Sequence, residues 1–315
     1  MTSKYQLPSL FQRLSSQHNQ KVKHLIALRE KKQYRLDHGN VIIQGYKTVQ
    51  EVRDQGIKFK SMIVTAKKDL NTETDIQSPS LQVIKQPEQF PAQQYYVTDI
   101  NLARRILGTA SKPGCHDIFA EAVIPHYDHD DAQIFNNDRI LVIDKISDPG
   151  NLGTLVRTAK ALGWQSGLIT HNSCDLYNDK CIRASRGLSL SWPHTTVNSN
   201  KLLDQLKKNG FTPIVADMLP RESQNVEIWS PENYSNAIPG TGVWFWNKPK
   251  SCPINKMALI LSSEHHGVDD AFSNELRVSL PMNSSVESLN VANAGSIIMS
   301  DLNRFYNTCL YQRST

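Results

Sequence analysis

The second half of the chain contains three short apolar runs, each followed by a polar loop and then by a helical pattern. The runs are residues 140–143, 257–261 and 278–280. Short apolar runs that end at turn residues are typical of buried strands, and repeated strand, loop and helix units form a mostly parallel sheet. Open sheets of this kind bind ligands at the carboxyl ends of their strands. The sequence therefore predicts an α/β domain in which three loops meet at one binding site.

The three strand, loop and helix units carry a particular set of residues. In chain order these are Asn151 and Arg157, then Glu264 and Gly267, then Ser288 and Asn290. Their order and spacing resemble the three motifs of the SpoU (TrmH) branch of the SPOUT RNA methyltransferases, which move a methyl group from S-adenosylmethionine to a ribose 2'-hydroxyl. The run 183–187 lies between the first two motifs, as a similar run does in that family.

The resemblance implies a C-terminal SPOUT trefoil-knot domain with a mostly parallel sheet over residues 139–315. Neither periodicity nor composition reveals a knot, so this expectation comes from the resemblance alone. A homodimer that buries the last helix is implied in the same way. The apolar stripe of that helix, formed by Ile297, Ile298, Leu302 and Phe305, is equally consistent with packing inside one chain.

By resemblance, Arg157 is the catalytic arginine. Because a guanidinium holds its proton tightly, we expect Arg157 to grip phosphate and stabilise the emerging 2'-alkoxide rather than to act as a base. The further catalytic residues implied are Asn151, Glu264, Ser288 and Asn290. The residues implied to bind S-adenosylmethionine are Leu261, Ser262, Glu264, Gly267, Leu280, Met282, Ser288 and Leu289.

Three of the polar site residues also have a purely structural interpretation. Arg157 could pair with a carboxylate such as Asp148, and Asn151 and Ser288 could cap helices. Ser262 occupies a position where the family usually has glycine, which puts cofactor affinity in question. The alternative function is therefore a non-catalytic RNA-binding assembly factor with the same fold, although the retained polar residues favour an enzyme.

The first 124 residues predict a small α/β domain, joined to the catalytic domain by a linker at 125–138. Periodicity and capping residues indicate helices at 19–32, 47–55 and 99–107 and strands at 41–43, 62–64, 81–84 and 118–124. Residues 18–23 and 41–45 resemble the substrate-binding domain of many SpoU enzymes, whose fold is that of small ribosomal proteins that bind kink-turn RNA. Gln44 stands where that domain usually has an acidic residue.

Basic residues are concentrated at the start of the chain. Residues 1–68 contain 14 Lys and Arg against 4 Asp and Glu, whereas the rest contains 21 against 26. Such a block indicates contact with a phosphate backbone, although a solvated helix face would look the same. The residues expected to contact RNA are Lys21, Lys23, Arg29, Lys31, Lys32 and Arg183.

Composition excludes several other classes of protein. No apolar run is long enough to span a membrane. The five cysteines include no C-x-x-C pair, which favours free thiols in a reducing compartment over structural zinc. Two histidines and three aspartates between His126 and Asp131 could ligate a metal, but they are adjacent in a polar stretch and are better read as an exposed linker. We expect no metal.

The RNA substrate is the least constrained feature. The two-domain form favours large-subunit rRNA, with tRNA second. Residues 243–250 place aromatics beside lysines and could stack on unpaired bases, or they could form an inserted hairpin. We expect a cytoplasmic protein. If the source is eukaryotic, a mitochondrial location is the alternative, because the first acidic residue is Glu30 and mitochondrial transit peptides are poor in acidic residues.

Overall fold

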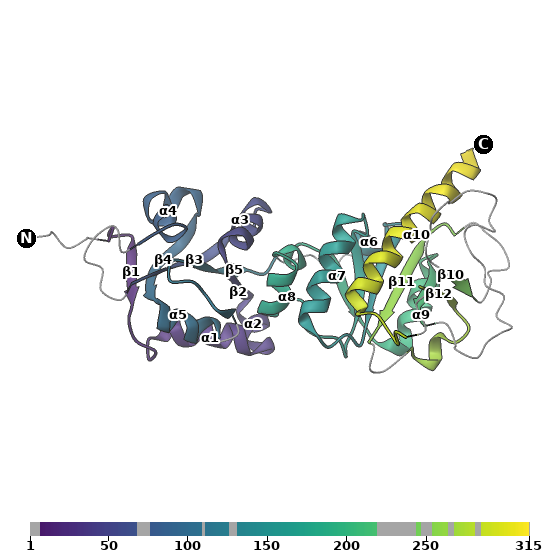
Figure 1. Cartoon of the computed structure of the whole chain (residues 1–315), viewed down its shortest axis with the longest axis horizontal. Coiled ribbons are helices and arrows are strands. Elements are labelled where there is room, and N and C mark those ends of the chain that lie inside the picture. Colours follow the sequence, from purple (N-terminus) through teal and green to yellow (C-terminus); the bar gives the residue numbers. More distant parts are fainter. Residues whose placement is uncertain are drawn as a thin grey trace, which may run out of the picture. The chain divides into compact units, whose positions relative to one another are not determined.

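The computed structural model describes residues 7–67, 76–108, 111–125, 131–218, 244–246, 254–263, 268–280 and 285–314, with only the backbone of 131–132, 244–246 and 308–314. Contacts divide the chain into two compact units, each with its own sheet (Figure 1). Unit 1 comprises residues 1–126 and 175–191, and unit 2 comprises residues 127–174 and 192–315. No helix among the described residues is long and apolar enough to cross a membrane.

Unit 1 contains a five-stranded mixed sheet. Its order is β1 (Phe11–Leu14), β4 (Ala92–Asp99), β3 (Phe59–Ala66), β5 (Ile118–Val123) and β2 (Asn40–Gln44). The pairs β1–β4 and β4–β3 are parallel, and β5 is antiparallel to both β3 and β2. The helices are α1 (Gln20–Glu30), α2 (Lys32–His38), α3 (Tyr46–Asp54), α4 (Ser80–Lys85) and α5 (Ile100–Leu107).

Alternating side chains give this sheet two apolar faces. Val41 and Ile43 of β2 belong to one buried cluster with Val49 of α3, whereas Ile42 belongs to a second cluster with Leu25 of α1 and Ile106 of α5. The period of two along a strand accounts for this alternation. Helices therefore cover both faces of the sheet, as expected for a small α/β domain.

The helix ends of unit 1 follow from local sequence. Asp99 caps α5 by accepting from the N–H groups of Asn101 and Leu102, and Gly108 ends it at a φ of +81°. Asn19 caps α1 through the N–H of Lys21. These caps confirm the predicted start of α1 and both ends of α5, whereas the helix predicted at 19–32 ends earlier, at Glu30, because Lys31 is extended.

One element of unit 1 is wrongly predicted and three are missed. Residues 81–84 were expected to form a strand, but they lie in α4, where Ser80, Val83 and Ile84 are buried at helical spacing. The strands β1 and β4 and the helix α2 were not predicted. β4 begins with exposed polar residues at Gln93 and Gln94, so only its second half has an apolar strand pattern.

Residues 175–191 join unit 1 although they follow the first strands of unit 2 in the chain. Ile182 and Leu190 are buried in the same cluster as β2 and α3. Arg35 forms an ion pair with Asp175 at 2.6 Å. Gly187 has a φ of +80°, and a Cβ there would lie 2.2 Å from Cγ2 of Val52, so only glycine allows this approach. The division by contacts thus differs from the sequence division in this segment, which contains α8 (Asp179–Ala184).

Unit 2 contains a seven-stranded, mostly parallel sheet, as predicted. Its order is β10 (Trp244–Trp246), β12 (Leu276–Ser279), β9 (Thr212–Ala216), β11 (Met257–Ser262), β6 (Arg139–Asp144), β7 (Ser166–Thr170) and β8 (His194–Val197). Only β10 pairs antiparallel, with β12. The helices are α6 (Asp131–Phe135), α7 (Pro149–Ala161), α9 (Ser199–Lys208) and α10 (Val291–Ser314).

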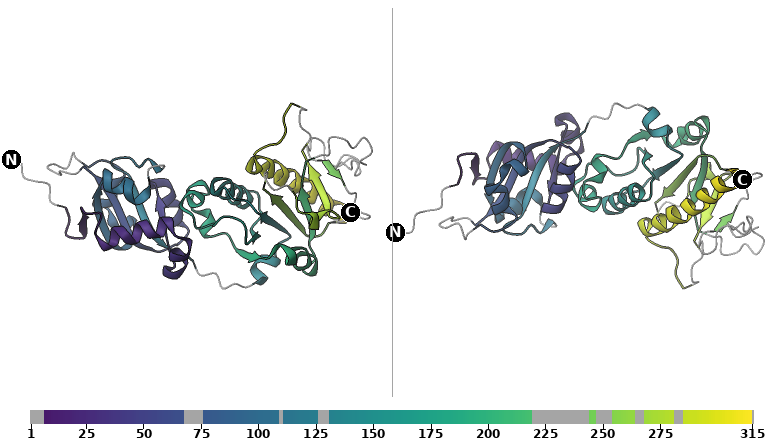
Figure 2. Two further views of the ribbon diagram at one scale, coloured as in Figure 1. Left: turned by 90° about the horizontal axis from the view of Figure 1, so that it is seen from below. Right: turned by 90° about the horizontal axis from the view of Figure 1, so that it is seen from above.

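Helices cover both faces of this sheet as well (Figure 2). Ile134 and Phe135 of α6 and Leu206 of α9 pack on one face, against strand residues that include Ile260. On the other face α10 approaches β11 and α7 so closely that a Cβ on Gly295 would lie 2.5 Å from Leu261 and within 2.7 Å of Leu155. The linker expected at 125–138 therefore contains a short helix whose side chains help to form the core of unit 2.

Candidate functional site

The strands that carry the three predicted loops end at one edge of the unit 2 sheet. β12, β9, β11 and β6 are consecutive neighbours and run parallel. The loops that follow β6, β11 and β12 therefore begin at the same edge. This is the position at which open α/β sheets bind ligands.

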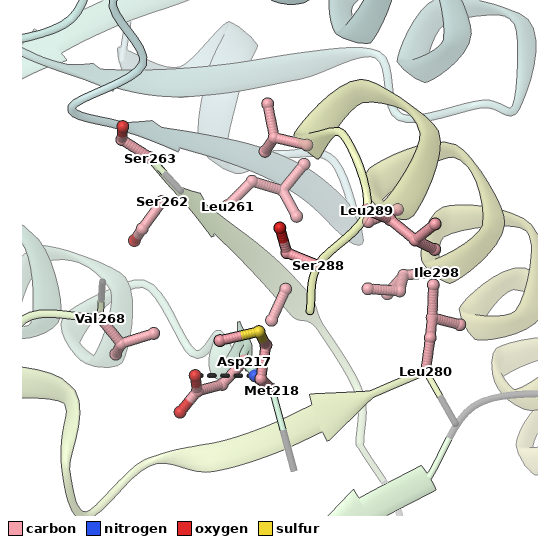
Figure 3. Close-up of a pocket in the computed structure, with 13 residues that line it drawn as sticks. Asp217, Met218, Leu261, Ser262, Ser263, Val268, Leu280, Ser288, Leu289 and Ile298 are labelled. Atoms are coloured by element: carbon pink, nitrogen blue, oxygen red, sulfur yellow. Dashed lines mark hydrogen bonds between the residues drawn. The ribbon is translucent and has the colours of Figure 1, made fainter. Parts of the chain in front are cut away.

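A pocket of about 770 Å³, counting its open mouth, lies at this edge (Figure 3). Five of its lining residues are among those implied to bind a cofactor, namely Leu261, Ser262, Leu280, Ser288 and Leu289. Side chains of α10 and the end of β9 complete the lining. The walls are mainly apolar with a few polar groups, as is usual for sites that bind small molecules.

A hydrogen bond joins the first and third loops. Nδ2 of Asn290 donates to Oδ1 of Asn151 at 3.0 Å. Oδ1 of Asn290 in turn accepts from the N–H groups of Ala292 and Asn293, so Asn290 caps α10. Two residues that are 139 positions apart in the sequence are thereby brought together, as the predicted site requires.

The capping interpretations of Asn151 and Ser288 are wrong. Asp148 caps α7 by accepting from the N–H of Asn151 at 2.7 Å, which places Asn151 inside the first turn. Asn290 performs the capping at α10, and Ser288 lines the pocket. Both side chains are thus available for other contacts.

Arg157 is exposed on α7, two turns after Gly150. Its side chain forms no hydrogen bond or ion pair with any other described residue. The alternative interpretation, in which Arg157 pairs with Asp148, is therefore wrong. Arg157 does not line the pocket itself. The next residue, Thr158, lies within 3.4 Å of Ser296 on α10, which places Arg157 beside the contact between α7 and α10.

Ser262 fits the strand without unusual backbone angles. It is the last residue of β11, opposite Asp144 of β6, and its φ is not positive. Its hydroxyl donates to Oδ2 of Asp144 at 3.3 Å. Asp144 is fully buried, and its Oδ1 has no partner among the described residues. The Ser262 hydroxyl, which a glycine at this position would lack, is therefore held by Asp144, a residue that does not line the pocket.

An ion pair between Lys145 and Asp269 lies at this edge of the sheet. Nζ of Lys145, directly after β6, lies 2.8 Å from Oδ2 of Asp269, which follows the pocket residue Val268. The hydrogen bond from Lys145 lowers the pKa of Asp269 and raises that of Lys145. Lys145 also has a φ of +53°, which a lysine rarely adopts. The pair connects the first loop to the end of the second.

Several predicted residues lie outside the described residues. These are Glu264, Gly267 and Met282, together with 126–130 of the candidate metal stretch and most of 243–250. Residues 244–246 form β10, which extends the sheet beside β12. Within the described ranges, no cluster of His, Cys, Asp and Glu could hold a metal ion.

The basic residues predicted in unit 1 divide into two groups. Lys23, Lys31 and Lys32 are exposed. Arg29 donates to the carbonyls of Arg105 and Ile106 at 3.0 and 2.7 Å and so caps α5, and Arg183 lies 3.3 Å from both Gln44 and Ser111. Gln44 stands where the family resemblance implies an acidic residue, and its amide oxygen accepts a hydrogen bond from Arg183.

Lys21 belongs to a buried network around Glu121. Its Nζ lies 2.5 Å from Oε2 of Glu121, and His24, Asn40 and Ser61 also contact that carboxylate. Burial alone would raise the pKa of Glu121. Hydrogen bonds from His24, Lys21 and Ser61 outweigh burial and lower the pKa from 4.5 to about 2. Lys21 therefore has a defined structural partner.

Sequence reasoning missed Asp217 and Met218, which also line the pocket. They follow β9, a strand that is not part of any of the three motifs. The parallel placement of β9 between β11 and β12 brings them to the pocket. The only signal in the sequence is an acidic residue directly after a buried strand.

Two family models match the chain. Residues 138–300 match the SpoU rRNA Methylase family, and residues 19–93 match the MRM3-like substrate binding domain. The 23S rRNA (guanosine(2553)-2'-O)-methyltransferase RlmP of Bacillus subtilis is 31% identical over 166 residues, which cover 52% of this chain and 57% of that protein. The mitochondrial rRNA methyltransferase 3 of Xenopus laevis is 21% identical over 336 residues, with 92% and 75% covered. The chain thus spans little more than half the length of the first of these relatives.

Solved structures share the fold over most of the chain. The SpoU methyltransferase AviRb from Streptomyces viridochromogenes has a TM-score of 0.66 at 17% identity, covering 92% of this chain and 98% of that one. An rRNA methyltransferase from Sinorhizobium meliloti has a TM-score of 0.67 at 18% identity, covering 94% and 98%. These matches confirm the predicted fold class for both domains.

Proposed function

The chain belongs to the SpoU rRNA methylase family, and we propose that it transfers the methyl group of S-adenosylmethionine to a ribose 2'-hydroxyl of large-subunit rRNA. The observation that carries the proposal is the pocket at the shared sheet edge, where five residues predicted from the sequence to bind the cofactor line one cavity. The substrate class is supported by relatives named as 23S rRNA 2'-O-methyltransferases.

The residues of the pocket suit S-adenosylmethionine. Leucines 261, 280 and 289 offer an apolar surface to an adenine ring, and Ser262, Ser288 and Asp217 provide polar atoms. The cofactor supplies a methyl group activated by a positively charged sulfur. The covalent chemistry therefore requires little from the protein beyond position and charge compensation.

Arg157 is suited to the phosphate and developing charge of the RNA. It is exposed, and no carboxylate among the described residues neutralises it. A guanidinium can bind phosphate through two parallel N–H groups and can stabilise an alkoxide without losing its own proton. The proton of the 2'-hydroxyl then passes to water or to a neighbouring acceptor.

Asn151 and Asn290 position the target ribose. Their mutual hydrogen bond holds the two loops in register, and each amide keeps further donor or acceptor capacity. Ser288 lines the pocket together with Leu261, Leu280 and Leu289. Glu264, Gly267 and Met282 complete the site in this proposal.

The proposal extends to assembly and location. The exposed Ile297 on α10 supports a homodimer through the last helix, and the family resemblance supports a trefoil knot. Exposed Lys23, Lys31 and Lys32, with Arg183, support RNA contact by unit 1. We assign the protein to the cytoplasm, with the mitochondrion as the alternative suggested by the Xenopus relative.

Methyl transfer to ribose can be distinguished from transfer to a base. Purified protein is incubated with radiolabelled S-adenosylmethionine and either unmodified large-subunit rRNA or unmodified tRNA. The RNA is then hydrolysed with alkali. Because a 2'-O-methyl group blocks cleavage of the adjacent phosphodiester, label is expected in alkali-resistant dinucleotides. Label in mononucleotides, or label only with tRNA, would refute the proposal.

A further inference from the structure

Asp217 provides the single charged side chain among the described residues that line the pocket. It directly follows β9, which lies between β11 and β12, so it stands at the sheet edge between the second and third loops. None of the three motifs includes it. Figure 3 shows its carboxylate next to Met218 at the pocket.

The carboxylate is held in place before any ligand binds. Oδ1 accepts from the N–H of Met218 at 2.8 Å, and Arg277 on β12 forms an ion pair with Oδ2. The backbone is equally constrained, since the Asp217 N–H donates to the carbonyl of Val278 and the Asp217 carbonyl accepts from the hydroxyl of Ser279 at 2.6 Å. A polar group fixed in this way at a pocket is a preorganised binding group.

The two contacts leave acceptor capacity on both oxygens. An ionised carboxylate offers about four lone-pair sites, and Met218 and Arg277 each occupy one. Two adjacent hydroxyl groups can donate to the remaining positions. A carboxylate after a parallel strand that accepts from ribose hydroxyls is also how dinucleotide-binding sheets hold their ligands.

We propose that Asp217 accepts hydrogen bonds from the 2' and 3' hydroxyls of the cofactor ribose and thereby contributes to cofactor affinity. The inference rests on the proposed function, because that function supplies the nucleoside. The ion pair with Arg277 favours hydroxyl donors over the cationic amino group of the methionine part, since it already compensates the charge of Asp217.

Two ligands separate these contacts. S-adenosylhomocysteine contains ribose and the amino acid, whereas 5'-methylthioadenosine contains ribose but lacks the amino acid and its cationic amino group. Both are titrated calorimetrically into the unsubstituted protein, into Asp217→Asn, and into Asp204→Asn, which makes the same change at an exposed position of α9. We expect Asp217→Asn to lose about 10- to 100-fold in affinity for both ligands alike, as for hydrogen bonds to a charged group, and Asp204→Asn to lose nothing.

Each other outcome has a distinct meaning. A loss for S-adenosylhomocysteine alone would assign Asp217 to the amino group and overturn the inference, as would unchanged affinity for both ligands. Failure of the unsubstituted protein to bind S-adenosylhomocysteine would instead refute the proposed function.

A second measurement begins with the unsubstituted protein, so its first comparison does not depend on the folding of the variant. The 2',3'-dideoxy form of 5'-methylthioadenosine should bind the unsubstituted protein 10- to 100-fold more weakly than the parent compound. In Asp217→Asn the two compounds should bind with nearly equal affinity, because the hydroxyls and the carboxylate then act as one pair. Equal affinities in the unsubstituted protein would overturn the inference.

Discussion

Arg157 illustrates how a single side chain can be assigned from its surroundings. Asp148, which precedes α7, is an obvious ion-pair partner, yet its carboxylate accepts a hydrogen bond from the backbone at the helix start. The guanidinium is left exposed, in a helix that packs on α10. An arginine that serves no described structural contact is suited to a substrate contact.

Replacement of Arg157 should therefore affect transfer and spare the fold. We expect Arg157→Ala to lower kcat by roughly 100-fold or more, since a charged donor to the developing oxyanion is lost. Arg157→Lys should recover only part of the rate, because an ammonium lacks the planar pair of donors. Affinity for S-adenosylhomocysteine and the free energy of unfolding should stay unchanged in both. Lys201→Ala, which removes an exposed cation from α9, serves as the control, and a normal rate in Arg157→Ala would contradict the assignment.

Glu121 makes the stability of unit 1 depend on pH. Its pKa is lowered from 4.5 to about 2 in the folded state, so its contribution is complete above about pH 5 and is lost as the pH falls toward 2. The shift corresponds to about 3 kcal/mol. Urea unfolding between pH 2 and 6 should show this loss, and the loss should be absent in Glu121→Gln. An identical pH dependence in the two proteins would show that other carboxylates are responsible.

At the scale of single residues, the sequence was informative where a motif existed. The family resemblance implied that Leu261, Leu280 and Leu289 bind the cofactor, and all three line the pocket. Asp217 was missed because its role depends on which strand lies beside β9. Strand order is a property of the folded sheet and leaves no local pattern.

At the scale of elements, Gly167 of β7 shows how tightly the unit 2 sheet is packed. A Cβ at this position would lie 2.2 Å from the carbonyl oxygen of Leu141 and 2.2 Å from the ring of Trp192. The oxygen belongs to the backbone of β6 and cannot move aside without breaking the ladder. The glycine is therefore required by close approach, at an ordinary φ.

The substitution Gly167→Ala should lower the free energy of unfolding by about 3 kcal/mol, which is at the upper end for overpacking because a backbone atom is involved. Gly114→Ala provides the matched control, because no atom lies within 4 Å of the added Cβ and the φ is not positive. Denaturant unfolding measures both. Equal stability of the two variants would mean that β6 and β7 can separate at no cost.

The basic residues on the first two helices of unit 1 differ in their surroundings. Lys31 and Lys32 lie exposed at the junction of α1 and α2, whereas Lys21 is held by Glu121. The double variant Lys31→Ala, Lys32→Ala should weaken RNA binding and lower the slope of log K against log salt by about 1 for each lysine. Lys21→Met should instead lower stability and leave the slope unchanged. The reverse pattern would assign RNA contact to Lys21.

Helix and strand could be predicted where the pattern was long or capped. The helix that begins after Asp99 and the strands β6 and β11 were predicted correctly. Residues 81–84 were misassigned because four mostly apolar residues fit either period, and the burial of Ser80 and Ile84 on one helix face decides between them. Neighbouring structure supplies information that so short a run does not contain.

At the scale of the whole molecule, the sequence predicts one domain boundary near residue 125. The contacts in the structure also assign residues 175–191 to unit 1. Residues 175–191 contribute Ile182 and Leu190 to the core of unit 1 although they connect two strands of unit 2. Composition does not change at their ends, so no sequence signal marks this assignment. The fourth run of the family resemblance, 183–187, lies within this segment.

The central claim is that three loops at the edge of the unit 2 sheet form one cofactor site next to Arg157. A crystal structure with S-adenosylhomocysteine tests it most directly. We predict electron density for the ligand between Leu261, Leu280 and Leu289, with its sulfur on the side of the pocket where Asn290 meets Asn151. Density at another place on the protein, or an empty pocket at saturating ligand, would contradict the account.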